Sequence, residues 1–148
     1  MKTIVAGSRD LVDYSLVEFA MKNVPWVVTE IVEGEAPGID SLAKEYGNNN
    51  KIPVKPFPAE WYIYDESGNR KFIRYAGYVR NVQMANHGEG LILIWDLKSK
   101  GSKHMFDIAK KKKMPIFLVI VNYIVVGDFH FRLLMHGIFK EGENIESW

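Results

Sequence analysis

Apolar and polar positions along this chain form blocks that predict strands and helices in turn. Short apolar runs bounded by turn residues are typical of buried strands, and they span residues 2–6, 26–32, 52–57, 90–95 and 115–121. Apolar residues recurring every three or four positions predict helices over 13–23, from 40 to about 46, 77–86 and 99–113. This alternation predicts a three-layer α/β sandwich with a mostly parallel sheet.

Two segments depart from the alternation. Residues 60–75 contain the turn sequence 65–69 and are predicted to form an irregular insertion. The apolar pieces of the tail, residues 123–148, favour a hairpin or an edge strand that caps the sheet or contacts a second copy. We therefore expect one domain over residues 1–148, with a core to about residue 121 and an extension over 122–148.

Composition and charge narrow the classes of function. The 148 residues include no Cys, which excludes disulfides, thiol catalysis and thiolate metal sites and fits a reducing compartment. No apolar stretch reaches the roughly 20 residues of a membrane helix, so we expect a cytoplasmic protein with no membrane partner. The net charge is +1, yet residues 70–113 hold eleven basic and three acidic residues. That basic middle suits an anionic ligand or a nucleic acid.

Three loops that directly follow predicted strands carry the candidate chemistry. They contain Gly7-Ser8-Arg9, then Gly34 to Asp40, then Lys98-Ser99-Lys100-Gly101-Ser102, and each precedes a predicted helix. The carboxyl ends of parallel strands meet at one edge of a sheet, where small residues and free helix amides receive anions. Neither a P-loop nor a dinucleotide-binding glycine motif is present. The loops predict a nucleotide-like, phosphate-bearing ligand.

Five motifs occur in an order that resembles a known family. They are Gly7-Ser8-Arg9, Glu33-Gly34-x-Ala36-x-Gly38-x-Asp40, Pro58-Ala59-Glu60-Trp61, Ala76-Gly77-x-x-Arg80-Asn81-x-x-Met84-Ala85 and Trp95-Asp96-x-Lys98-Ser99-x-Gly101-Ser102-x-x-Met105. Over residues 2–121 the series is similar to the small SLOG-type proteins of bacteria and phages. These are Rossmann-like relatives of the DNA-processing protein DprA and of the lonely-guy phosphoribohydrolases. The resemblance implies a Rossmann-like fold that binds nucleotides or their derivatives, often as a homodimer.

The catalytic pattern of the lonely-guy enzymes is incomplete here. They carry Gly-Gly-x-Gly-Thr-x-x-Glu at the third loop, and the position of the catalytic Glu is occupied by Met105. Arg80 matches the arginine of the preceding helix, whereas Asn81 replaces its lysine. Cleavage of an N-glycosidic bond needs a carboxylate, for which the nearby acids Asp96 and Glu33 could substitute. The candidate catalytic residues are therefore Arg80, Asp96 and Glu33, and the sequence favours a binding protein over an enzyme.

The leading hypothesis is a protein that senses or sequesters a nucleotide-derived small molecule. In this hypothesis backbone amides, Lys98 and Arg80 hold phosphate, and Trp61 or Trp95 stacks the base. The predicted ligand-binding residues are Gly7, Ser8, Arg9, Gly34, Gly38, Asp40, Trp61, Arg80, Asn81, Trp95, Asp96, Lys98, Ser99, Gly101 and Ser102.

Simpler roles stay open at several of these positions. Gly7 and Gly38 can be turn residues, Ser8 and Asp40 helix caps, and Trp61 a packing residue. A nucleotide N-glycosidase is the alternative function, and single-stranded DNA binding is a weaker one. Because the sequence shows no interleaved basic and aromatic pattern, nucleic acid is not expected as a partner. No cofactor is expected, and the four His show no metal-ligand spacing.

Overall fold

Strands and helices alternate along the chain in the computed structural model, which describes residues 1–148. The first half contains β1 (Lys2–Gly7), α1 (Tyr14–Asn23), β2 (Glu30–Glu33), α2 (Ile39–Asn49), β3 (Val54–Pro56), β4 (Tyr62–Tyr64) and β5 (Arg70–Phe72). The second half contains α3 (Ala76–His87), β6 (Gly90–Trp95), α4 (Lys100–Lys111), β7 (Ile116–Val126), β8 (Phe129–Ile138) and a 3₁₀ turn, η1 (Ile145–Ser147).

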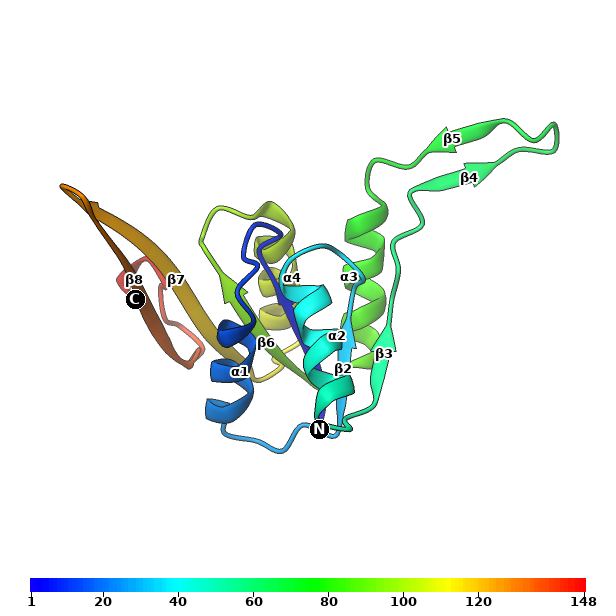
Figure 1. The fold of residues 1–148 in the computed structure, drawn as a ribbon. Coiled ribbons are helices and arrows are strands. Elements are labelled where there is room, and N and C mark those ends of the chain that lie inside the picture. Colours follow the sequence, from blue (N-terminus) through cyan, green and yellow to red (C-terminus); the bar gives the residue numbers. More distant parts are fainter.

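The main sheet has six strands in the order β3-β2-β1-β6-β7-β8 (Figure 1). All neighbours pair in parallel except β8, which runs antiparallel to β7. This arrangement confirms the predicted Rossmann-like fold with its C-terminal strand pair. The chain winds outward from β1 to β3 and then returns to place β6 on the other side of β1. The loops after β1 and β6 therefore flank the point where the strand order reverses, which is where open α/β sheets bind ligands.

Helices cover both faces of this sheet and fix the position of its loops. On one face, Leu16 of α1 and Ile39 of α2 pack with odd-numbered residues of β7 such as Val119. On the other face, Met84 of α3 and Met105 of α4 pack with the even-numbered residues. All six residues of β6 are buried, as its continuous apolar run predicts. Each buried Leu, Ile or Met stabilises the fold by about 1.5–3 kcal/mol, so the central strands hold the loops that follow them in fixed positions.

The second strand is shorter than its apolar run predicts. Residues 26–32 are predicted as a strand, but β2 begins at Glu30. The indole Nε1 of Trp26 donates to Thr3 Oγ1 at 3.0 Å, so this side chain covers the start of β1. The amide of Thr29 donates to the carbonyl of Met1. The apolar character of this segment therefore serves packing around the N-terminus.

The insertion at residues 60–75 is an ordered hairpin, so its prediction as irregular is wrong. Strands β4 and β5 pair antiparallel as a separate two-stranded sheet. In the turn, Asp65 Oδ1 accepts the amides of Ser67 and Asn69, and Gly68 takes a φ of 81° that favours glycine. Figure 1 shows this hairpin projecting beyond the carboxyl ends of the main sheet.

A second arm is formed by β7 and β8. The first six residues of β7 are buried and the last five are exposed, because the strand runs past the layer of helices. The predicted strand at 115–121 therefore corresponds only to the buried part. No helix here combines the length and the apolar surface that a membrane crossing requires.

Candidate phosphate-binding site

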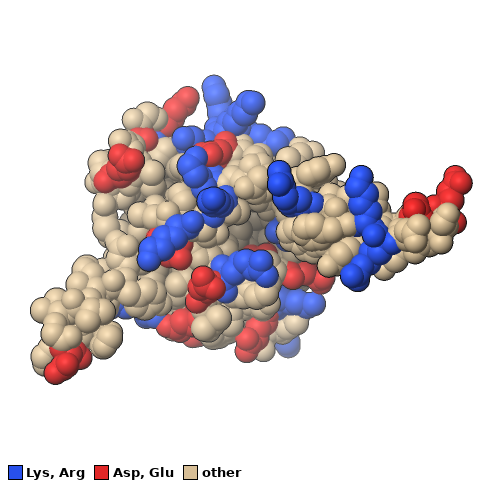
Figure 2. All heavy atoms as spheres, turned by 90° about the horizontal axis from the view of Figure 1, so that it is seen from above, with Lys and Arg blue, Asp and Glu red and all other residues tan.

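A cavity of about 580 Å³ lies where the strand order reverses. Its lining includes no large apolar side chain and consists of Ser8, Arg9, Asp10, Pro37, Asp96, Lys98, Ser99, Lys100 and Gly101. Seen from above the carboxyl ends, several Lys and Arg side chains surround a hollow in the middle of this face (Figure 2). The first and third predicted loops therefore do meet, and a polar ligand has room between them.

The cations of this cavity form no ion pair and no side-chain hydrogen bond with the protein. Arg9, Lys98 and Lys100 are exposed, and none of the five ion pairs of the structure includes them. At the start of α4, no protein acceptor takes the amides of Lys100 and Gly101. A Cβ added to Gly101 would meet nothing within 4 Å, so the backbone there is open to a ligand. Free cations beside free helix amides are the groups that bind phosphate.

Asp96 holds the third loop in shape. Its Oδ1 accepts the Ser8 hydroxyl at 2.8 Å and the amides of Lys98 and Ser99 at 2.9 and 3.1 Å. Burial opposes ionisation of Asp96, but these hydrogen bonds outweigh it and lower the pKa of the carboxyl. Ser8 is itself buried and does not cap α1, because Asp13 performs that role. Both Ser8 and Asp96 thus join the two loops.

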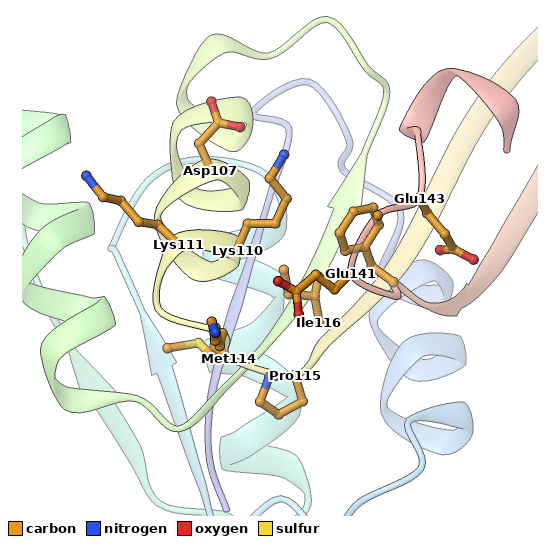
Figure 3. Close-up of a pocket in the computed structure, with 11 residues that line it drawn as sticks. Asp107, Lys110, Lys111, Met114, Pro115, Ile116, Glu141 and Glu143 are labelled. Atoms are coloured by element: carbon orange, nitrogen blue, oxygen red, sulfur yellow. The ribbon is translucent and has the colours of Figure 1, made fainter.

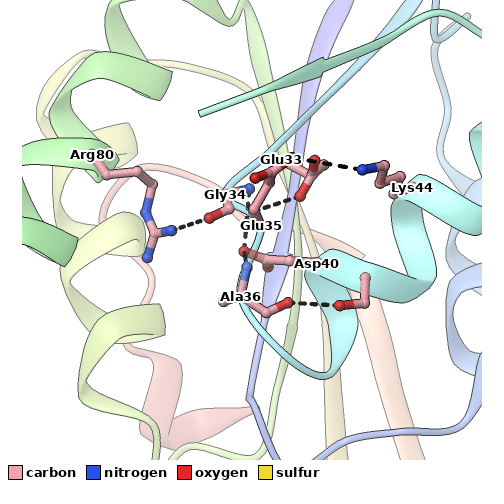
Figure 4. A network of polar contacts seen from close by, with 8 residues as sticks. Glu33, Gly34, Glu35, Ala36, Asp40, Lys44 and Arg80 are labelled. Atoms are coloured by element: carbon pink, nitrogen blue, oxygen red, sulfur yellow. Dashed lines mark hydrogen bonds and ion pairs between the residues drawn. The ribbon is translucent and has the colours of Figure 1, made fainter. Parts of the chain in front are cut away.

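A buried acid organises the second loop (Figure 4). Asp40 Oδ2 accepts the amides of Gly34 and Ala36 at 3.2 and 3.3 Å, and Arg80 donates to the Gly34 carbonyl. Burial raises the pKa of Asp40 to about 6, although the charge of Arg80 and the two amides oppose it. Helix α2 begins at Ile39, one residue before the predicted cap, so Asp40 lies in its first turn.

Glu33, a candidate catalytic residue, is completely buried at the end of β2. Its Oε2 accepts the amide of Glu35 at 2.5 Å, and its Oε1 has no hydrogen-bond partner. Burial raises the pKa of Glu33 to about 7, with a further contribution from the nearby negative charge of Asp40. A carboxylate in this position is closed to a ligand in the cavity.

Arg80 and Asn81 lie between the second and third loops. Arg80 Nε donates to Asn81 Oδ1 at 3.1 Å, and Asn81 Nδ2 donates to the Gly101 carbonyl at 3.3 Å. Burial lowers the pKa of Arg80, and the negative charges of Asp40 and Glu33 act against this shift. Arg80 therefore balances buried acids, and Asn81 links α3 to the start of α4.

A smaller cavity adjoins the first. It has a volume of about 210 Å³ and is lined by Trp61, Arg74, Gly77, Tyr78, Arg80, Asn81 and Gly101. Because Gly101 also lines the larger cavity, the two share a wall. Trp61 is 39% exposed here, so it can contact a ligand. By contrast, Trp95 is 4% exposed and donates through Nε1 to the Ser99 carbonyl, so the prediction that it stacks a base is wrong.

Several predicted ligand residues are fixed by packing. A Cβ on Gly7 would lie 2.2 Å from the Ile94 carbonyl oxygen, and one on Gly34 would meet Arg80. Gly38 has a φ of 79° and its backbone lies against that of Arg9. Ser102 is buried and lines neither cavity. Sequence reasoning did not select Lys100, Arg74 or Tyr78, although Lys100 lies within the third loop.

The largest remaining cavity lies elsewhere (Figure 3). It measures about 600 Å³ and lies between the end of α4, the start of β7 and the C-terminal segment. Its charged lining mixes Lys110 and Lys111 with Glu141 and Glu143. It holds none of the predicted site residues and lies at the amino end of β7, away from the edge where parallel sheets bind ligands.

Comparisons with known proteins agree with this fold. Residues 1–64 match the YAcAr family, described as the YspA, cpYpsA-related SLOG family. The structure resembles DprA from Streptococcus pneumoniae (TM-score 0.63, 19% identity), covering 79% of this chain and 49% of that one. It also resembles DprA from Helicobacter pylori (TM-score 0.56, 21% identity), and this match covers 79% of this chain and 64% of that one. No curated protein matches the sequence. The chain thus spans about half to two thirds of the solved proteins it resembles.

One prediction about partners is corrected by these comparisons. The H. pylori DprA is a single-stranded DNA-binding protein. Because a protein of similar fold binds single-stranded DNA, the expectation that nucleic acid is an unlikely partner is wrong. The family match and the two structural likenesses together confirm the SLOG-type resemblance that the five motifs predicted.

Proposed function

We propose that this chain binds the phosphate of a nucleotide unit in the cavity between the loops after β1 and β6. The observation that carries the proposal is the polar cavity at the strand-order reversal, with Arg9, Lys98 and Lys100 unpaired beside free amides of α4. Phosphate accepts hydrogen bonds from all of these groups, and their charges complement its own. The adjoining cavity beside Trp61 has room for the attached base or sugar.

Two kinds of molecule carry such a phosphate: a free nucleotide derivative and single-stranded nucleic acid. The polar cavity, of about 580 Å³, has room for a small nucleotide derivative, which would be sensed or sequestered there. The likeness to H. pylori DprA favours single-stranded DNA as the second candidate. Both candidates use the same phosphate contacts, so one set of variants tests them together.

The geometry does not favour the hydrolase alternative. Oxocarbenium chemistry requires a carboxylate at the reacting carbon. Glu33 and Asp40 are buried, and Asp96 Oδ1 is occupied by the Ser8 hydroxyl and two amides. These three acids therefore act as structural groups, and the proposal is limited to binding.

The test is binding of AMP, ADP-ribose, NAD and a cyclic dinucleotide, measured by thermal shift and calorimetry on the wild type and on Lys98→Ala. Lys112→Ala is the matched control, because Lys112 is an exposed lysine at the opposite end of α4. We expect Lys98→Ala to weaken binding about tenfold, equal to about 1.4 kcal/mol, and Lys112→Ala to leave it unchanged. Equal losses in both variants, or no binding by the wild type of either these nucleotides or a single-stranded oligonucleotide, would refute the proposal.

A further inference from the structure

We propose that the β4–β5 hairpin is a base-stacking arm that makes single-stranded nucleic acid the ligand of the neighbouring phosphate cavity. This inference rests on the proposed function, and it names the class of ligand. Its starting observation is that the hairpin exposes three aromatic side chains, Tyr62, Tyr64 and Phe72, which no helix or strand covers.

The register places these rings on one face. Tyr62 lies opposite Phe72, and Tyr64 lies opposite Arg70. In an antiparallel pair, opposite residues and alternate residues share a face, so three rings and one guanidinium form a continuous surface. The Arg70 guanidinium lies 4.1 Å from the centre of the Tyr62 ring. Rings interleaved with a cation in this way are the stacking surface that single strands use.

The charge of the arm complements a phosphate backbone. Arg70 and Lys71 belong to β5, and Arg74 follows it. Asp65 and Glu66 lie at the far turn, and Figure 2 shows the arm basic near the body and acidic only at its tip. On the ring face a single-stranded nucleic acid would therefore meet Arg70, and then Arg74 near the body, while Lys71, opposite Ile63, lies on the other face. An acidic protein partner would not need the exposed ring faces, whereas unstacked bases do.

The arm is continuous with the proposed phosphate site. Trp61 directly precedes β4 and stacks on Phe72, with ring centroids 6.0 Å apart and an angle of 9°. The same Trp61 lines the smaller cavity with Arg74, and Gly101 joins this cavity to the larger one. One ligand can thus place a phosphate at the start of α4 and successive bases along the hairpin.

Single-stranded ligands have an advantage over duplexes on such a surface. The bases of a duplex are already stacked on one another, so their faces are closed to the three rings. A free nucleotide offers one base, which the cavity beside Trp61 can hold without the arm. Affinity should therefore rise from mononucleotide to single strand and depend on the hairpin only for the single strand.

The experiment measures fluorescence anisotropy of a labelled thymidine oligonucleotide about twelve nucleotides long, within the roughly 4–16 nucleotides that such surfaces span. Tyr64→Ala removes a ring that is 68% exposed, and Tyr123→Ala, 62% exposed on the other arm, is the matched control. We expect Tyr64→Ala to weaken binding of the single strand by about five- to 150-fold, and Tyr64→Phe to restore it. Tyr123→Ala should bind like the wild type, and AMP binding should be the same in all variants.

The outcomes separate the two proposals. If the wild type binds AMP but not the oligonucleotide, or if Tyr64→Ala binds the oligonucleotide unchanged, the hairpin inference is overturned and the phosphate site stands. Equal affinity for the single strand and its duplex also overturns the inference. If the wild type binds neither AMP nor the oligonucleotide, the proposed function itself fails.

Discussion

Replacing Glu33 by Gln should stabilise the protein in alkaline solution and much less in acid. The folded state holds the proton of Glu33 up to about pH 7, whereas the unfolded chain releases it near the ordinary pKa of 4.5. Between pH 4.5 and about pH 7 the unfolded state binds fewer protons than the folded state, so the free energy of unfolding falls as pH rises. The shift from 4.5 to about 7 corresponds to about 3 kcal/mol, most of which falls between pH 5 and pH 8.

Gln is the suitable replacement because it preserves shape and removes the charge. Its carbonyl oxygen can accept the Glu35 amide, and its NH₂ takes the place of the unpartnered Oε1. An amide left without an acceptor costs about 1–3 kcal/mol at every pH, so the absolute effect contains a constant offset. The informative quantity is therefore the change in the mutational effect between the two pH values.

Urea unfolding at pH 5 and pH 8 measures this quantity, with Glu35→Gln as the control. Glu35 is the exposed neighbour, paired with Lys44 at 3.6 Å, and its replacement should have a small effect at both pH values. Relative to the wild type, Glu33→Gln should gain about 2–3 kcal/mol on going from pH 5 to pH 8, or roughly 5–10 °C in melting temperature. The same mutational effect at both pH values would show that Glu33 is not held neutral by burial.

Four further substitutions test the remaining parts of the site. Ser8→Ala should lower stability by about 1–2 kcal/mol and raise the pKa of Asp96, followed by NMR titration, because the carboxylate loses a hydroxyl donor. Gly101→Ala should stabilise α4 by up to about 1 kcal/mol and weaken ligand binding, whereas Gly7→Ala should fail to fold in a solubility assay. Arg80→Met should destabilise the protein by roughly 3–5 kcal/mol at pH 8 in urea unfolding, because it leaves buried acids without their cation. Wild-type stability in Arg80→Met, or an unchanged pKa in Ser8→Ala, would contradict the corresponding contact.

The regular part of the fold could be predicted from the sequence because burial and periodicity agree there. The run at 90–95 is apolar throughout, and it forms the fully buried central strand β6. The segments at 26–32 and 123–126 are equally apolar, but one packs around the N-terminus and the other extends into an exposed arm. Hydrophobicity along the chain does not tell which apolar residues a neighbour covers. The hairpin at 62–72 was missed because its strands have three residues each and face solvent on both sides, so they show no alternation.

The position of the site could be predicted, but the role of each residue could not. Parallel strands bring their carboxyl ends together, so loops far apart in sequence were expected to meet, and Ser8 and Asp96 do meet at 2.8 Å. Whether a glycine receives a ligand or only avoids a clash depends on what faces its missing Cβ. Gly7 faces a carbonyl and Gly101 faces open space, a difference that arises only from tertiary packing.

The cations of the site also divide into those that face a ligand and those that are fixed by packing. This division explains why the site suits binding of a ligand rather than its hydrolysis. Arg80 and Lys98 are equivalent as sequence candidates, yet Arg80 lies among buried acids while Lys98 stands exposed and unpaired over the cavity. Salt screens exposed charges strongly and buried ones weakly. Ligand affinity should therefore fall with added salt through Arg9, Lys98 and Lys100, while the contribution of Arg80 to folding persists. Lys98 and Lys100 can thus be altered without changing the cation that holds the second loop, whereas Arg9 also acts electrostatically on Asp40 and Arg80.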